Sequence, residues 1–176
     1  MEYVILMRKI NVGTENRIGK RELEKLFLDL GYDTVGIYIN SGNVILSTTK
    51  PKAVIAQEIA RALKDKFNEE IQFLIKTRNE MHNIAMQIPD EWQNNDEQKT
   101  DIAYLFEDID HEEIIEELPF KKEYVNVKYV KGALMMNVLR DNQGKSQLTK
   151  LISSRIYKSM TLRNVNTARY LGNRNQ

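Results

Sequence analysis

The sequence predicts an α+β protein built as a tandem of two ferredoxin-like (split βαβ) plait-type halves with mostly antiparallel sheets. Short segments of strand composition alternate with longer segments whose apolar residues recur at helical spacing. Their order is βαββαβ in the first half and βαββα in the second. We therefore expect a first unit over residues 1–76, a helix and linker over 77–99, and a second α+β unit with a C-terminal helix over 100–176.

The first half opens on a strand, because residues 3–7 form an uninterrupted apolar run that is typical of a central strand buried on both faces. A helix is predicted over residues 20–30, and Gly31 follows it where a helix C-terminus favours positive φ. The apolar residues that keep helical spacing in this segment are Leu23, Leu26, Phe27 and Leu30.

A hairpin and a second helix continue the first half. Residues 32–39 and 44–47 have strand composition, and the residues between them are typical of a turn. Pro51 suits the first turn of a helix, whose apolar positions continue to Phe67. Alternating apolar residues over 71–75 then predict a fourth strand.

The second half begins with a helix predicted over residues 77–87, which Pro89 ends. The polar segment 89–99 is predicted to be a linker or an exposed loop. Residues 100–106 read as a strand, and residues 110–118 as a short acidic helix that ends before Pro119.

A second hairpin and two helices are expected at the end of the chain. The strands 124–130 and 133–139 are joined by Lys131 and Gly132, and Met135 and Met136 are predicted core residues of the second strand. Apolar spacing over residues 148–152 indicates another helix, and a final helix is predicted to begin near Asn164.

Composition narrows the class of protein. The chain has no cysteine, which excludes disulfide frameworks, thiolate nucleophiles and cysteine-ligated metal centres. No apolar run approaches the length of a membrane span, and the first residues do not have the pattern of a signal peptide. We expect a soluble, cytoplasmic protein that does not bind membranes.

Charge is unevenly distributed although the net charge is +1. From Glu80 to Glu117 the chain is rich in acids, with Lys99 the only lysine or arginine. The segment after Asp141 has no acid, and its basic residues include Lys145, Lys150, Arg155, Lys158, Arg163, Arg169 and Arg174. One interpretation is pairing of the two segments within the chain or between subunits of a homo-oligomer; the other is a basic surface that binds nucleic acid or protein.

Two polar segments of the first half point to a binding site. The end of the first strand leads into Arg8, Asn11, Gly13 and Arg17, and the hairpin contains Ser41, Gly42 and Asn43. In a βαββαβ plait the third strand lies antiparallel between the first and second, so the two segments are expected to share one edge of the sheet. Backbone N–H groups at the start of the first helix would favour an anion there, with phosphate or carboxylate as the natural ligand.

A purely structural interpretation applies to the same residues. Gly13 and Gly42 are suited to positive φ, while Asn11, Asn16, Asn40, Ser41 and Asn43 are residue types that cap turns. The chain has no Walker-type loop and no Gly-x-Gly-x-x-Gly motif, so no nucleotide is specified. Ser41 has no evident base, so a hydrolase triad is not supported and no catalytic residue or cofactor is assigned.

At these residues the chain resembles a bacterial family, the domain of unknown function 1697. The motifs are Arg8-Lys9-Ile10-Asn11-Val12-Gly13, Asn16-Arg17-Ile18, Glu22-Leu23 through Leu30-Gly31, Tyr38-Ile39-Asn40-Ser41-Gly42-Asn43-Val44, and the run from Tyr157 to Thr167. The resemblance spans nearly the whole chain and implies a two-part α+β fold, but it transfers no reaction or ligand. Members usually carry Arg-Gly-Ile-Asn-Val-Gly-Gly, so Lys9 and Thr14 replace two glycines that would let a ligand approach the backbone.

The resemblance also directs attention to a late polar stretch, Arg163, Asn164, Asn166 and Thr167. In one interpretation Asn164 is the N-cap of the last helix, with Thr167 three residues on. In the other, the stretch folds back toward Arg8 and Ser41 and completes the site.

The two histidines and one acidic cluster are further candidates for chemistry. His82 lies on a predicted helix beside Met81 and is expected to be a surface or half-buried helix residue. The cluster Asp108, Asp110, His111, Glu112 and Glu113 has hard-metal ligand types, but Asp110 and Glu113 have the spacing of a capping box. We interpret the cluster as a solvated helix start and predict no metal site.

Two functional hypotheses follow. In the first, the protein is a module that binds a small anionic or phosphate-bearing ligand at the edge of the N-terminal sheet. In the second, it is a nucleic-acid or protein interaction module that uses the basic C-terminal segment with Tyr157 and Tyr170.

Overall fold

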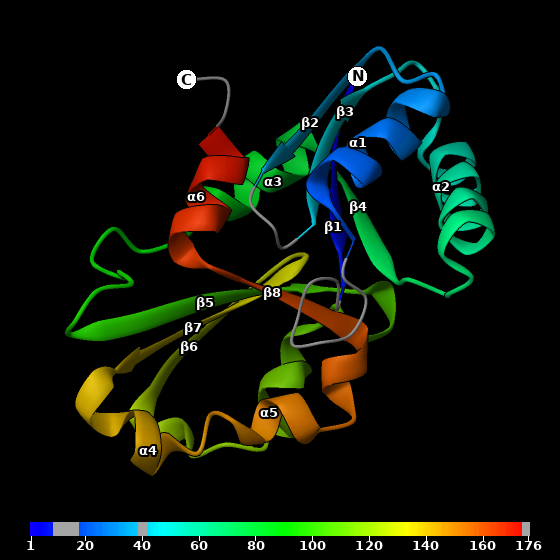
Figure 1. The fold of residues 1–176 in the computed structure, drawn as a ribbon. Helices are drawn as coiled ribbons and strands as arrows, with labels where there is room; N and C mark the ends of the chain where they lie inside the picture. The colour runs from blue at the N-terminus through cyan, green and yellow to red at the C-terminus, as the bar shows by residue number, and fades with distance from the viewer. Residues whose placement is uncertain (9–17, 39–41, 174–176) are drawn as a thin grey trace. The chain divides into compact units, whose positions relative to one another are not determined.

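Two four-stranded antiparallel sheets with helices make up the protein, which is an α+β fold as predicted. The computed structural model describes residues 1–8, 18–38 and 42–173 (Figure 1). The chain divides into two compact units, Met1–Arg78 and Asn79–Gln176. Each unit contains one of the sheets.

The first unit has the element order βαββαβ. Its elements are β1 (Glu2–Met7), α1 (Lys20–Asp29), β2 (Thr34–Tyr38), β3 (Asn43–Ser47), α2 (Lys52–Phe67) and β4 (Phe73–Thr77). The strand order across the sheet is β2-β3-β1-β4, and each neighbouring pair is antiparallel. As the sequence predicts, β3 therefore lies between β1 and β2, which run in the same direction.

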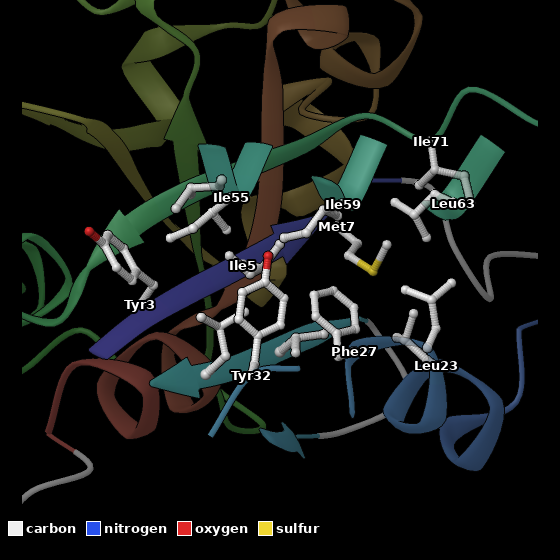
Figure 2. Packing of buried hydrophobic residues seen from close by; sticks show 14 of the residues in the cluster. Tyr3, Ile5, Met7, Leu23, Phe27, Tyr32, Ile55, Ile59, Leu63 and Ile71 are labelled. Atoms are coloured by element: carbon white, nitrogen blue, oxygen red, sulfur yellow. The ribbon is translucent and has the colours of Figure 1, made fainter. Parts of the chain in front are cut away.

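The core of the first unit lies between one face of this sheet and the helices α1 and α2 (Figures 1 and 2). Tyr3, Ile5 and Met7 point into it from alternate positions of β1. The apolar faces of both helices pack against these residues. Their buried side chains are Leu23, Leu26 and Phe27 of α1 and Ile55, Ile59 and Leu63 of α2. Burial of such side chains stabilises by about 1.5–3 kcal/mol each.

The remaining predictions for the first strand and first helix are confirmed. Val4 and Leu6, which alternate with the core residues of β1, are also fully buried, so the strand is buried on both faces. Helix α1 ends at Asp29, and Gly31 has the positive φ of 78° expected after a helix C-terminus.

The second unit repeats the strand order of the first. Its strands are β5 (Gln98–Leu105), β6 (Val125–Val130), β7 (Ala133–Leu139) and β8 (Met160–Asn164), in the order β6-β7-β5-β8. Its α-helices are α3 (Arg78–Ala85), α4 (Gln143–Ser146), α5 (Lys150–Ser153) and α6 (Val165–Asn173). The 3₁₀ segments are Glu107–Ile109, Glu112–Glu117, Lys122–Tyr124, Arg140–Asn142 and Ile156–Ser159.

Two features of this unit differ from the βαββα prediction. Strand β8 was not predicted, because only five residues carry the alternating pattern and one of them is Arg163; pairing with β5, far away in sequence, makes the segment a strand. The acidic segment 110–118, predicted as an α-helix, contains the 3₁₀ segment Glu112–Glu117 instead. Its length, limited by Pro119, does not allow a stable α-helix.

The core of the second unit lies on one face of its sheet. Alternate residues of the strands, such as Ala103, Leu134 and Met136, pack there against the 3₁₀ segments and α5. The opposite face is also buried and includes Ile102, Tyr104, Met135 and Arg163. Met135 and Met136 are thus both core residues, as predicted.

None of the helices in the described ranges is both long and apolar enough to cross a membrane.

Candidate functional site

The ends of all four strands of the first sheet meet along one edge. Met7, the last residue of β1, donates its backbone N–H to the carbonyl of Gly42 at 2.9 Å. Arg8, the next residue, donates its own N–H to the carbonyl of Gln72 at 2.8 Å, just before β4. We call the group Arg8, Gly42, Asn43 and Gln72 the first-sheet rim. Antiparallel pairing of β1 with both β3 and β4 places these residues together, as the topology predicts.

Arg8 supplies the positive charge of the rim. Its side chain is only 8% exposed, and Nη1 donates to Oε1 of Gln72 at 3.3 Å. The position of the guanidinium is therefore determined by β4 as well as by its own strand. A cation removed from water to this extent interacts more strongly with an anion than a fully hydrated one does.

Gly42 and Asn43 have the roles that the purely structural interpretation of the hairpin predicts. Gly42 has φ of +72°. The buried side chain of Asn43 donates from Nδ2 to the carbonyl of Tyr38 at 3.0 Å, across the β2–β3 connection. Asn11, Gly13, Arg17 and Ser41 lie outside the described residues, as do the departures Lys9 and Thr14.

The start of helix α1 lies at the same end of the sheet. Figure 2 shows Leu23, from the first turn of α1, near Met7, with Phe27 and Tyr32 farther toward Tyr3. The N-cap residue is Gly19, and within the described ranges no side chain caps the helix. Uncapped backbone N–H groups and the positive end of the helix dipole are thus oriented toward the rim end.

The late polar stretch has a capping role. Oδ1 of Asn164 accepts a hydrogen bond from the backbone N–H of Thr167 at 2.9 Å, which confirms Asn164 as the N-cap of α6. Asn166 is exposed on the first turn. This stretch belongs to the second unit and the rim to the first, so its closure over Arg8 and Ser41 stays a prediction.

Arg163 is buried on β8. Its Nη1 donates to Oγ1 of Thr161 at 2.9 Å and to the carbonyl of Leu162 at 2.8 Å. Burial lowers the pKa of the guanidinium to about 10, against the opposing influence of Tyr104 and Tyr157. The residue remains a cation at neutral pH.

Comparison with known proteins gives a family and a fold. The family described as "Protein of unknown function (DUF1697)" matches residues 1–135 of the 176. The chain belongs to this family. No curated protein shows a significant match to this chain.

A solved structure similar to this DUF1697 chain is that of the conserved bacterial protein SP0830 from Streptococcus pneumoniae. The two share 21% sequence identity with a TM-score of 0.84, over 97% of this chain and 96% of that one. At this level of identity the similarity shows the fold, which agrees with the predicted two-part α+β architecture.

The residues of the acidic cluster in this DUF1697 chain make contacts with other parts of the second unit. Among the side chains that the structure describes, no group of three His, Asp or Glu residues is placed to hold a metal ion. Asp108 and His111 instead line a hollow of about 510 Å³ with Ser154, Arg155 and Ser159. There the Ser159 hydroxyl donates to Oδ2 of Asp108 at 2.6 Å. Sequence reasoning missed the serines and Arg155, because they come from a segment about 45 residues away.

Asp110 is neither solvated nor a helix cap. Its Oδ1 accepts hydrogen bonds from the backbone N–H of Gly132 at 2.8 Å and from the Tyr129 hydroxyl at 2.9 Å, and Oδ2 lies 2.9 Å from Nζ of Lys131. Burial tends to raise the pKa of the Asp110 carboxyl, but these partners together hold it below its ordinary value. Burial, together with the hydrogen bond to Asp110, raises the pKa of Tyr129 to about 12. Asp110 therefore fixes the β6–β7 turn.

Asp110→Asn is expected to lower the free energy of unfolding at pH 7 by about 1–3 kcal/mol, because it removes charge-assisted hydrogen bonds. A carboxyl whose pKa is depressed on folding stabilises above its unfolded pKa of about 4, and this stability is lost as pH falls through the folded pKa. Melting temperatures of both proteins at pH 7 and pH 3 check this. An equal difference at the two pH values would contradict the account.

Two arginines of the basic C-terminal segment make contacts within the second unit. Arg169 of α6 donates to the carbonyl of Pro89 at 3.0 Å, to that of Asp90 at 3.4 Å and to Oε1 of Gln93 at 3.1 Å. Arg163 is buried. These two side chains stabilise the fold, which leaves fewer basic groups for a nucleic-acid surface than the sequence suggests.

Proposed function

We propose that this DUF1697 protein binds a small anionic or phosphate-bearing ligand at the first-sheet rim. The observation that supports the proposal most is the position of Arg8: it follows Met7, whose backbone N–H donates to the carbonyl of Gly42 just before β3. A guanidinium and a glycine backbone thus lie at the same end of the sheet.

These groups suit an anion for physical reasons. Arg8 offers N–H donors from a poorly hydrated cation, and its contact with Gln72 limits the orientations it must lose on binding. A glycine in a left-handed conformation presents its backbone without a side chain in the way. Helix α1 covers the sheet face that carries Met7, and Arg8 alternates with Met7 along the chain, so the guanidinium supplies the positive charge for the ligand.

Calorimetric titration with inorganic phosphate and pyrophosphate tests the proposal. Arg8→Gln is expected to weaken binding by about 10–100-fold, which corresponds to loss of one charge-assisted hydrogen bond. Gln72→Ala, which keeps the charge and removes its orienting partner, is expected to weaken binding by a smaller factor. Arg61→Gln on the exposed face of α2 serves as the control and is expected to bind like the wild type.

Thermal unfolding of each variant verifies that it is folded. The proposal is wrong if neither anion binds the wild type, or if folded Arg8→Gln binds both as tightly as Arg61→Gln does.

The proposal also includes the fold of the first unit and the location of the protein in the cell. The strand order β2-β3-β1-β4 with two helices on one face supports a ferredoxin-like plait for the first unit. The absence of cysteine from the sequence agrees with a reducing compartment and supports a cytoplasmic location for the binding.

A further inference from the structure

A chain of hydrogen-bonded amides crosses the second sheet at the end where β6 and β5 begin and β7 ends. Asn126 donates from Nδ2 to Oδ1 of Asn137 at 3.2 Å. Asn137 donates in turn to Oε1 of Gln98 at 2.6 Å and to Oγ1 of Thr100 at 2.8 Å. Thr100 is fully buried and Asn137 is 4% exposed. Burial of a polar group costs free energy unless the group is hydrogen-bonded. The bonds of this chain of side chains, which we call the amide ladder, therefore offset the cost of burying Thr100 and Asn137.

The loop before β5 is fixed by the same set of bonds. The Thr100 hydroxyl donates to the carbonyl of Gln93 at 2.7 Å, and the backbone N–H of Gln93 donates to Oε1 of Gln98 at 3.0 Å. Nε2 of Gln98 donates to the carbonyl of Glu91 at 3.0 Å. Arg169 holds the start of the loop at Pro89 and Asp90. Trp92, between these points, is therefore held in a defined place.

The ladder and the loop line a hollow of about 700 Å³ that is widely open to solvent. Trp92, Val127 and Leu139 give it apolar surface, and Glu91, Gln98 and Asn126 give it polar groups. Asn126 is at the exposed end of the ladder, where one bond to Asn137 orients its amide and its Oδ1 accepts no hydrogen bond from a described residue. The hollow thus presents an aromatic side chain beside a pre-oriented amide, which is the composition of a small-molecule site.

We infer that this hollow binds an uncharged polyhydroxylated ligand, such as a residue of a sugar. An indole offers a broad apolar face and one N–H donor, which suits the C–H face of a sugar ring. Amides donate and accept together, as hydroxyl groups do, so each can bond to a hydroxyl in either direction. No lysine or arginine is among the residues that line the hollow, and the Glu91 carboxylate disfavours phosphates and other anions.

The site is separate from the first-sheet rim in residues and in ligand chemistry. The rim is in the first unit and requires an anion, whereas the hollow is in the second unit and disfavours one. Either inference can fail without the other.

Trp92 makes the test direct, because it is the only tryptophan in the chain. Titration of the full chain with maltotriose and with N-acetylchitotriose is expected to change Trp92 emission saturably for at least one of the two. Asn126→Ala is expected to weaken that binding by about fivefold or more. Asn83→Ala removes another exposed amide of the same unit, on α3, and is expected to leave it unchanged.

Adenosine and phosphate are the competing probes. The inference is overturned if neither trisaccharide changes the emission, if adenosine or phosphate does so in their place, or if folded Asn126→Ala binds as tightly as Asn83→Ala. Asn126 is exposed, so its truncation tests the ligand contact without opening the core.

Discussion

Phe27→Ala is expected to lower the free energy of unfolding by about 3–5 kcal/mol. Phe27 of α1 is fully buried in the first core, with its ring centroid 6.3 Å from that of Tyr32 (Figure 2). Truncation removes the ring from between α1 and the sheet and leaves a cavity that backbone elements on both sides cannot fill without moving. The loss is a large part of the stability of a typical domain.

Leu28 provides the matched control. It is the next residue of the same helix and is 52% exposed, so Leu28→Ala is expected to cost less than about 1 kcal/mol. Urea unfolding followed by far-UV circular dichroism compares the two variants. A Phe27→Ala protein as stable as Leu28→Ala would contradict the position assigned to α1 on the sheet.

Gly172→Ala is expected to lower the free energy of unfolding by about 1–3 kcal/mol. A Cβ at Gly172 of α6 would overlap the Cβ of Ala85 on α3 and would lie 3.0 Å from the carbonyl oxygen of Met81. The two helices must separate to admit the methyl group. Their separation would also strain the bond that His82 donates from Nδ1 to the Gly172 carbonyl at 3.2 Å.

Gly144→Ala is the control for this substitution. A Cβ at Gly144 of α4 meets no atom within 4 Å, so this change is expected to be neutral or to stabilise by up to about 1 kcal/mol. Urea unfolding monitored by Trp92 emission reports on the second unit in both cases. Equal stability of the two variants would show that α3 and α6 do not pack as closely as described.

Local patterns predicted the regular elements well. Apolar spacing gave α1 and α2, alternation gave β4, and the Lys131–Gly132 connection gave the β6–β7 hairpin. Caps were equally predictable, because Gly31 and Asn164 act on their own helices. His82 is half-buried on α3, as its position beside Met81 indicated. In each case the residues that determine the structure are neighbours in the sequence.

Features that depend on distant residues were not predicted. β8 exists through its pairing with β5, and Asp110 binds a turn about 20 residues later. The segment 89–99, predicted as a linker or exposed loop, contains the start of β5 and is bonded to α6 through Arg169. Single-sequence patterns carry no information on such partners unless the topology is known.

The two candidate sites also differ in how far the sequence predicts them. The first-sheet rim could be predicted because strand order alone brings the end of β1 beside the start of β3. The amide ladder had one local signal: Asn126 and Asn137 interrupt apolar strands, and the Lys131–Gly132 turn sets the register that pairs them. Trp92, Gln98 and Thr100 join them only through folding of the loop.

Nuclear magnetic resonance of the ¹⁵N-labelled chain, titrated with inorganic phosphate, tests the proposed anion site most directly. We predict saturable shifts of the backbone amides of Arg8, Gly42 and Asn43, with the amides around Arg61 of α2 unchanged. Amide shifts of Arg8 and Gly42 that stay within those of Arg61 at every phosphate concentration would contradict the proposal.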